Sequence, residues 1–138
     1  MAKKNNLRNK LTHQEQRELN VEIEFMEGIV RRAPEYVEAL QILGDDYTRR
    51  GSIAEGLKVD QQLAQLRPED PLICYNLACS YSLAKKYALA VGALERAFQF
   101  GYRNFKWMAK DPDLKNLRSS PLYETIRAKL RDLQKMRL

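Results

Sequence analysis

Few side chains in this sequence have the chemistry and the spacing of a catalytic site. The single histidine, His13, falls at the predicted start of a helix, where a solvated residue is expected rather than a general base. The adjacent Asp45 and Asp46 have no matching acid or ligand set, and Asp111 and Asp113 have the positions of helix-capping residues. The six glycines are isolated and form no phosphate-binding loop. We therefore expect no catalytic residues and no enzyme activity.

The two cysteines also do not have the spacing of a disulfide or a metal site. Cys74 and Cys79 lie five residues apart in a segment expected to be helical, so their side chains leave the helix on different faces and do not reach disulfide geometry. A metal site would need more ligands than these two thiols and the distant His13. The sequence therefore predicts reduced cysteines, no metal and no cofactor.

The N-terminus and the hydropathy bear on location. The basic residues near the N-terminal methionine are followed by no apolar segment of the kind found in secretory signals. No stretch approaches the roughly 18 consecutive apolar residues that a membrane span requires. These features predict a cytoplasmic protein that does not cross a membrane.

Charge is unevenly distributed along the chain, whose net charge is +6. Residues 1–10 carry four basic side chains and no acid, residues 11–70 carry 7 basic and 13 acidic, and residues 71–138 carry 13 basic and 5 acidic. Such asymmetry favours an acidic partner, nucleic acid or head-to-tail self-association. Solvated helix faces are the alternative interpretation.

The elements that must position any binding site are helices. Thr12 and Glu15 have the spacing of a capping box, which predicts a leading helix within 12–34 that stops before Pro34, after a flexible basic segment of residues 1–11. Four more segments with helical stripes of apolar residues follow, over 36–50, 53–66, 71–84 and 87–100. Because the loops between them are very short, neighbouring helices must run antiparallel.

These helices repeat with a period of 34 residues. Shifted by 34, Leu43 meets Leu77, Gly44 meets Ala78, and Tyr47 meets Tyr81. A Gly or Ala at the contact point lets two helices approach, and the tyrosine one turn later fills the space beside it. The last part of the chain is less regular: Asp111 before Pro112 and Ser120 before Pro121 are helix starts, and Tyr123, Ile126, Leu130 and Leu133 stripe a final helix.

The pattern resembles the tetratricopeptide repeat. Leu43-Gly44-Asp45-Asp46-Tyr47 with Gly51, Gly56 and Pro68 is similar to one repeat, and Leu77-Ala78-Cys79-Ser80-Tyr81 with Ala90 and Ala97 is similar to the next. Gly56 and Asp60 depart from the family pattern, which usually has alanine and an aromatic residue there. Residues 111–123 resemble the segment that closes some bacterial arrays of this family.

The resemblance implies an all-α fold in which antiparallel helical hairpins stack as a short right-handed superhelix, with an N-terminal helix and a C-terminal capping helix. Residues 12–138 then form a single domain, divided into a leading helix (12–34), repeats at 37–70 and 71–104, and a cap at 105–138. A cap is expected because the last repeat would otherwise expose its stacking face, and the residues predicted to cover that face are Trp107, Leu114, Leu117 and Tyr123.

The resemblance also implies a concave groove lined by the first helix of each repeat. The predicted partner-binding positions are Gln41, Asp45, Arg49, Leu72, Tyr75, Asn76, Cys79, Leu83, Lys106 and Lys110. Among them, Leu72, Tyr75 and Leu83 predict an apolar site for an extended peptide or a helix of a partner protein. The alternative is that a terminal helix of the chain itself folds into the groove.

The predicted function is a non-catalytic protein-interaction module or scaffold with a protein or peptide partner. The family's clamp for a chaperone carboxylate is matched only in part: Asn76, Lys106 and Lys110 are compatible with it, whereas Gln41 and Asp45 are not. Nucleic-acid binding is the other hypothesis, because basic residues gather at both ends of the chain, at Lys3, Lys4, Arg8, Lys10, Arg127, Lys129, Arg131, Lys135 and Arg137. Self-association stays open.

Overall fold

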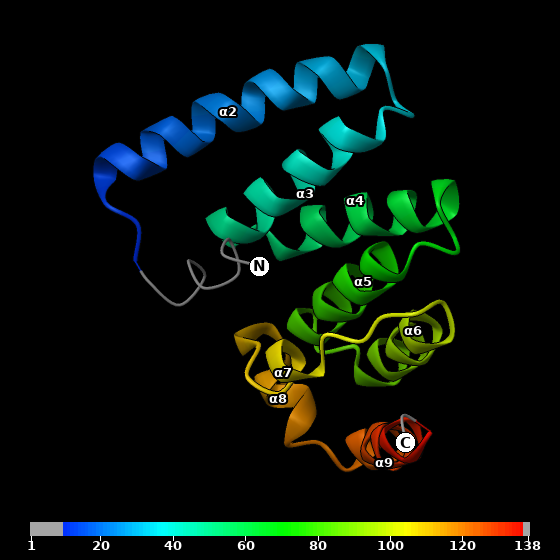
Figure 1. The fold of residues 1–138 in the computed structure, drawn as a ribbon. Coiled ribbons are helices and arrows are strands. Elements are labelled where there is room, and N and C mark those ends of the chain that lie inside the picture. Colours follow the sequence, from blue (N-terminus) through cyan, green and yellow to red (C-terminus); the bar gives the residue numbers. More distant parts are fainter. Residues whose placement is uncertain (1–9, 137–138) are drawn as a thin grey trace. The chain divides into compact units, whose positions relative to one another are not determined.

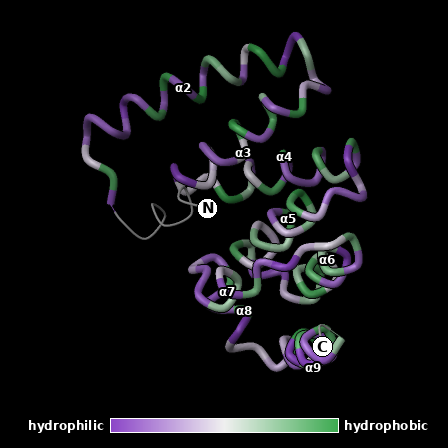
Figure 2. Tube along the Cα trace, in the orientation of Figure 1, coloured by the Kyte–Doolittle hydropathy of each residue, from purple (hydrophilic) through white to green (hydrophobic). Residues whose placement is uncertain are grey.

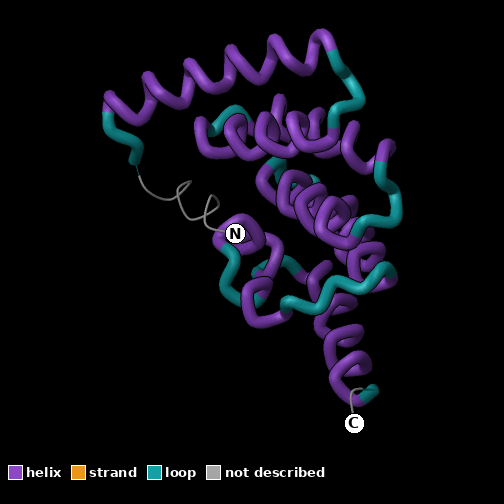
Figure 3. The backbone as a smooth tube through the Cα atoms, turned by 45° about the horizontal axis from the view of Figure 1, so that its top comes forward, coloured by secondary structure: helices purple, strands orange, loops and turns teal. Residues whose placement is uncertain are grey.

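The computed structural model describes residues 10–136, and the helical class predicted from the sequence is confirmed. The elements along the chain are α2 (His13–Arg32), α3 (Val37–Arg50), α4 (Ile53–Leu66), α5 (Pro71–Leu83), α6 (Tyr87–Gln99), α7 (Phe105–Met108), η2 (Pro112–Leu114), α8 (Lys115–Arg118), η3 (Pro121–Tyr123) and α9 (Glu124–Lys135) (Figure 1). Within these residues there is no strand, and short loops join the helices (Figure 3). The predicted segment 1–11 lies outside the described residues except for Lys10 and Leu11.

The chain divides into two compact units, which we call unit 1 (Met1–Pro68) and unit 2 (Glu69–Leu138). The boundary falls close to the junction of the two predicted repeats. Unit 1 holds α2, α3 and α4, and unit 2 holds all later elements.

Unit 1 begins with the capping box that the sequence predicts. The Thr12 hydroxyl accepts the backbone N–H of Glu15 at 3.1 Å, and the Glu15 carboxylate accepts the backbone N–H of Thr12 at 2.9 Å. Helix α2 is mainly hydrophilic, with apolar residues at intervals along it (Figure 2). Its buried residues, Leu19, Ile23 and Met26, recur at helical spacing, and α2 packs against α3.

Helices α3 and α4 form a hairpin whose close approach depends on glycine. A Cβ placed on Gly44 would lie 3.3 Å from the Val59 side chain of α4, so a larger residue there would push the helices apart. The turn between them uses Gly51, whose φ of 88° is in the left-handed region that other residues rarely adopt. Gly44 therefore lets α3 and α4 approach each other closely, as the sequence pattern predicts for a small residue at this position.

Unit 2 begins with a second hairpin of similar length. Asp70 caps α5 by accepting the backbone N–H groups of Leu72 and Ile73, and Pro71 takes the first helical position. The starts of α3 and α5, at Val37 and Pro71, lie 34 residues apart, as do the starts of α4 and α6 at Ile53 and Tyr87. The repeat in the sequence is therefore also a repeat of helical hairpins.

The end of unit 2 folds back on this hairpin as a series of short elements. Element η2 packs on α5, and both η3 and α9 pack on α6. The fully or almost fully buried side chains of this segment are Met108, Asp111, Asp113, Leu114, Leu117, Tyr123 and Ile126. Of the residues predicted to cover the last repeat, Leu114, Leu117 and Tyr123 are buried, whereas Trp107 is only half-buried.

Candidate functional site

The groove positions predicted in unit 1 lie on α3 and are partly accessible. Gln41, Asp45 and Arg49 are half-buried, and the neighbouring Ile42 is 42% exposed. Since α3 also carries the buried residues that pack against α2 and α4, this stripe is the part of α3 left for other contacts.

In unit 2 the prediction of an open apolar groove on α5 is wrong at Tyr75 and Cys79. Both side chains are 0% exposed. The Tyr75 ring stacks on Tyr102, with centroids 4.2 Å apart and planes 5° apart, and its hydroxyl donates to Asp111 Oδ2 at 2.6 Å. These residues are therefore part of the core of unit 2 and cannot contact a partner protein.

The alternative predicted from the sequence, in which the chain fills its own groove, is closer to the structure. The covering segment is not a terminal helix, however, but the stretch around η2 that precedes α8. The physical reason is that the chain turns at Asp111 and Pro112, which brings a buried carboxylate to the Tyr75 hydroxyl.

Asp111 is the centre of a buried polar cluster. Its Oδ1 accepts the backbone N–H of Asp113 at 3.0 Å, which is the capping role predicted from the sequence. Its Oδ2 accepts the Tyr75 hydroxyl and also lies 3.6 Å from the Cys79 thiol, and Arg118 donates to its backbone carbonyl at 2.9 Å. The sequence predicts the capping role of Asp111. It does not predict the hydrogen bond to Oδ2, because Tyr75, which donates it, lies 36 positions away.

Cys79, Asp111 and Asp113 also bring possible ligand atoms within 4.8 Å of one another. No pattern along the chain indicates this arrangement, because Cys79 and Asp111 are 32 residues apart. The Asp111 carboxylate already accepts hydrogen bonds from a hydroxyl, a thiol and a backbone N–H. This pattern fits a structural anchor for η2 on α5.

The other predicted groove residues of unit 2 remain at or near the surface. Leu72 is 42% exposed, and Asn76 and Leu83 are half-buried. Lys106 on α7 and Lys110 just after it are exposed. Because Tyr75 and Cys79 are buried, the accessible predicted residues of α5 are Leu72, Leu83 and Asn76. They do not form a continuous apolar strip.

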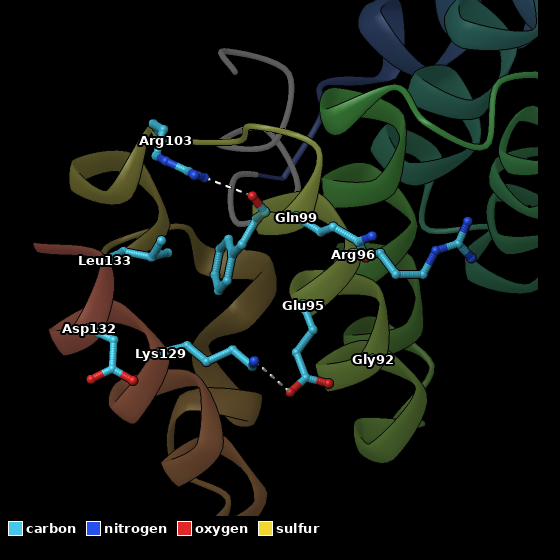
Figure 4. A pocket seen from close by; sticks show the side chains of 9 residues that line it. Gly92, Glu95, Arg96, Gln99, Arg103, Lys129, Asp132 and Leu133 are labelled. Carbon is cyan, nitrogen blue, oxygen red and sulfur yellow. Dashed lines mark hydrogen bonds and ion pairs between the residues drawn. The ribbon is translucent and has the colours of Figure 1, made fainter. Parts of the chain in front are cut away.

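A groove that sequence reasoning missed lies in unit 2 between α6 and α9. It has a volume of about 690 Å³ and is lined by Gly92, Glu95, Arg96, Phe98, Gln99, Arg103, Lys129, Asp132 and Leu133 (Figure 4). Lys129 extends from α9 toward Glu95 on α6, with 4.0 Å between Nζ and Oε2. Arg103 is held at one end, where its Nη1 donates to the carbonyl of Phe98 at 2.9 Å.

The chemistry of this groove suits a polypeptide. Three basic and two acidic side chains line it together with Phe98, Leu133 and the bare backbone of Gly92. Mixed charges around an apolar strip can pair with side chains of either sign while apolar contacts supply affinity. The groove has no histidine, cysteine or hydroxyl side chain that could act as a base or nucleophile.

Each unit contains a buried tyrosine whose phenol has a raised pKa, so we expect both units to lose stability in alkali. Burial raises the pKa of Tyr75 far above its ordinary value near 10, and burial with a hydrogen bond to Glu27 raises the pKa of Tyr47 to about 12. A raised pKa means that the folded chain holds the phenol proton more tightly than the unfolded chain does. The contribution of this proton to the free energy of unfolding is therefore fully present below about pH 10 and is lost as the pH rises toward the pKa of the folded state.

We therefore expect the unfolding temperature to fall between about pH 10 and pH 12, and Tyr75→Phe to reduce the slope of that fall. Thermal unfolding followed by circular dichroism across this range measures it. Tyr36→Phe, at a side chain that is 49% exposed, is the control. An unchanged slope in Tyr75→Phe would show that ionisation of the Tyr75 phenol does not cause the loss of stability in alkali.

No helix among residues 10–136 is both long enough and apolar enough to span a lipid bilayer.

Comparison with known proteins gives limited similarity. No family model matches the chain. A curated chloroplastic protein of Arabidopsis thaliana is 31% identical over 86 residues, which are 60% of this chain and 26% of that protein. The chain thus spans about a quarter of the length of this relative, and the similarity concerns a segment of it.

Proposed function

We propose that this chain is a non-catalytic protein-binding module of the tetratricopeptide type, which holds a polypeptide segment of a partner protein in the α6–α9 groove. The observation that carries the proposal is the groove itself, with its volume of about 690 Å³ and its mixed charges around Phe98 and Leu133. The 34-residue repetition of the helix starts supports the repeat type.

The groove is suited to this role because it is built on helices. Side chains on packed helices lose little freedom on binding, so less of the contact energy is spent on ordering the site. The α9 wall is fixed to unit 2 by Ile126, which is 0% exposed, and by the contacts of α9 with α6 and η3.

Gly92 allows a direct test. It lines the groove, and a Cβ built on it meets nothing within 4 Å, so the helix can accept a side chain there. We expect Gly92→Trp to fill the groove and remove partner capture. Gly92→Ala, the matched control, should keep capture and stabilise α6 by about 0.5–1 kcal/mol, because alanine favours the helix.

Capture from cell extract by the three forms, followed by identification of the retained peptides, measures the first effect, and urea unfolding measures the second. Equal capture by Gly92→Trp would contradict the groove as the site. Retention of RNA or DNA that declines steeply with salt would instead support the nucleic-acid alternative.

The same proposal includes a cytoplasmic location, supported by the buried thiols Cys74 and Cys79, which are not joined in a disulfide. The Arabidopsis relative is named as chloroplastic. Imaging of the tagged chain distinguishes the two locations.

A further inference from the structure

Helix α2 of unit 1 has an apolar face that no described residue covers. Val21 and Phe25, one helical turn apart, are 65% and 67% exposed. They lie in a shallow groove of about 590 Å³ whose other lining residues are Gln14, Arg17, Glu18 and Glu22. Isolated exposed apolar side chains are ordinary, whereas two adjacent ones in a groove offer an apolar contact that a partner could cover.

The 34-residue repeat shows what normally covers this face. Phe25 is equivalent to Val59 of α4, which is 8% exposed, and to Ala93 of α6, which is 7% exposed. In unit 1, Val59 faces Gly44 of α3, the first helix of its hairpin. The Phe25 position of α2 is therefore one that packs on a preceding helix in the complete hairpins, whereas Val21, whose equivalents Glu55 and Leu89 are exposed, lies at the edge of that contact.

The side chains of α2 set the chemistry of a helix that could cover this face. Glu22 is equivalent to Gly56 of α4 and to Ala90 of α6, both of which are buried. A helix that covers Phe25 therefore also covers the Glu22 position, and the Glu18 carboxylate, which accepts a hydrogen bond from the Gln14 side chain at 2.8 Å, lines the same groove. Covering the Glu22 carboxylate removes it from water, so a stable complex needs Lys or Arg opposite it.

We propose that this face of α2 binds a basic amphipathic helix of another protein. The helix places apolar residues over Val21 and Phe25 and Lys or Arg side chains opposite Glu18 and Glu22. Because Phe25 and Glu22 are larger than their equivalents, this helix lies farther from α2 than α3 lies from α4. The surface belongs to unit 1 and does not depend on the α6–α9 groove.

A second copy of the chain is a less suitable occupant. Two-fold pairing of this face with itself would gather four carboxylates, Glu18 and Glu22 of each copy, against only the two Arg17 guanidinium groups. Like charges around one apolar stripe oppose such pairing.

The test uses two stapled helical peptides with the same leucine and alanine stripe, one flanked by arginines and the other by glutamates. Their binding to the full chain is measured by fluorescence anisotropy. We expect the arginine peptide to bind at least roughly tenfold more tightly, and Phe25→Ala to weaken it roughly tenfold. The double change Glu18→Arg with Glu22→Arg should reverse the preference.

Leu89→Ala is the matched control, because Leu89 occupies the position on α6 equivalent to Val21 and is 53% exposed. It should leave peptide binding unchanged, as should Gly92→Trp, so this proposal and the α6–α9 groove can fail separately. No binding, equal binding of both peptides, or binding insensitive to Phe25→Ala would overturn the proposal. Phe25-dependent self-association in sedimentation would also overturn it and assign the face to a second copy.

Discussion

Replacing Asp111 by alanine should lower the free energy of unfolding of unit 2 by about 3 kcal/mol. The side chain is 0% exposed, and its two oxygens accept the Tyr75 hydroxyl at 2.6 Å and the Asp113 backbone N–H at 3.0 Å. Alanine would leave a buried hydroxyl without its acceptor and η2 without its cap. The fluorescence of Trp107, the single tryptophan, reports on unit 2 in urea unfolding.

Asp70→Ala is the matched control for this prediction. Asp70 also precedes a proline and caps a helix, accepting the backbone N–H groups of Leu72 and Ile73 at 2.9 and 3.1 Å. It lacks the buried tyrosine partner, so its loss should cost only about 1 kcal/mol. Asp111→Asn should fall between the two, because an amide can still cap the helix. Equal losses for Asp70→Ala and Asp111→Ala would show that capping is the only role of Asp111.

Tyr75→Ala should destabilise unit 2 by about 4 kcal/mol, more than Asp111→Ala. The phenol is fully buried and stacks on Tyr102 with ring centroids 4.2 Å apart, so truncation leaves a cavity and removes the donor to Asp111. Tyr75→Phe keeps the stacked ring and loses only the hydroxyl. It should cost about 1–2 kcal/mol in the same urea measurement.

The exposed Tyr36 supplies the control, since Tyr36→Ala removes a ring that is 49% accessible to solvent. Its effect should stay within about 0.5 kcal/mol. If Tyr75→Ala unfolds no more easily than Tyr36→Ala, the stacking of Tyr75 in the core is wrong. Any loss of partner capture in Tyr75→Ala would reflect the unfolding of unit 2, so the groove is better tested at Gly92.

The two proposed binding surfaces differ in how far each could be read from the sequence. The α6–α9 groove joins residues more than 30 positions apart, such as Gly92 and Leu133, whose spacing carries no signal along the chain. The α2 face is visible in the sequence as Val21 and Phe25, but they have the same residue types as a core stripe. Only burial distinguishes the exposed Phe25 from the buried Ile23.

The sequence by itself determined the helices and their repetition. Capping by Thr12 and Glu15, termination before prolines, and apolar spacing depend on contacts within a few residues, and the expected helices over 53–66 and 71–84 appear as Ile53–Leu66 and Pro71–Leu83. The small residue at Gly44 likewise reflects a contact between sequence neighbours in one hairpin. Such short-range interactions leave a periodic pattern that can be read directly.

Only the tertiary structure decided what covers each helix face. Helical periodicity places Tyr75 and Cys79 on one side of α5, but it does not say whether solvent, a partner or the chain itself lies there. The answer is the segment around Asp111, which returns after α6 and α7 and forms a hydrogen bond that no local pattern encodes. The same reasoning explains the opposite outcome on α2, where Val21 and Phe25 remain exposed because no described helix returns to them.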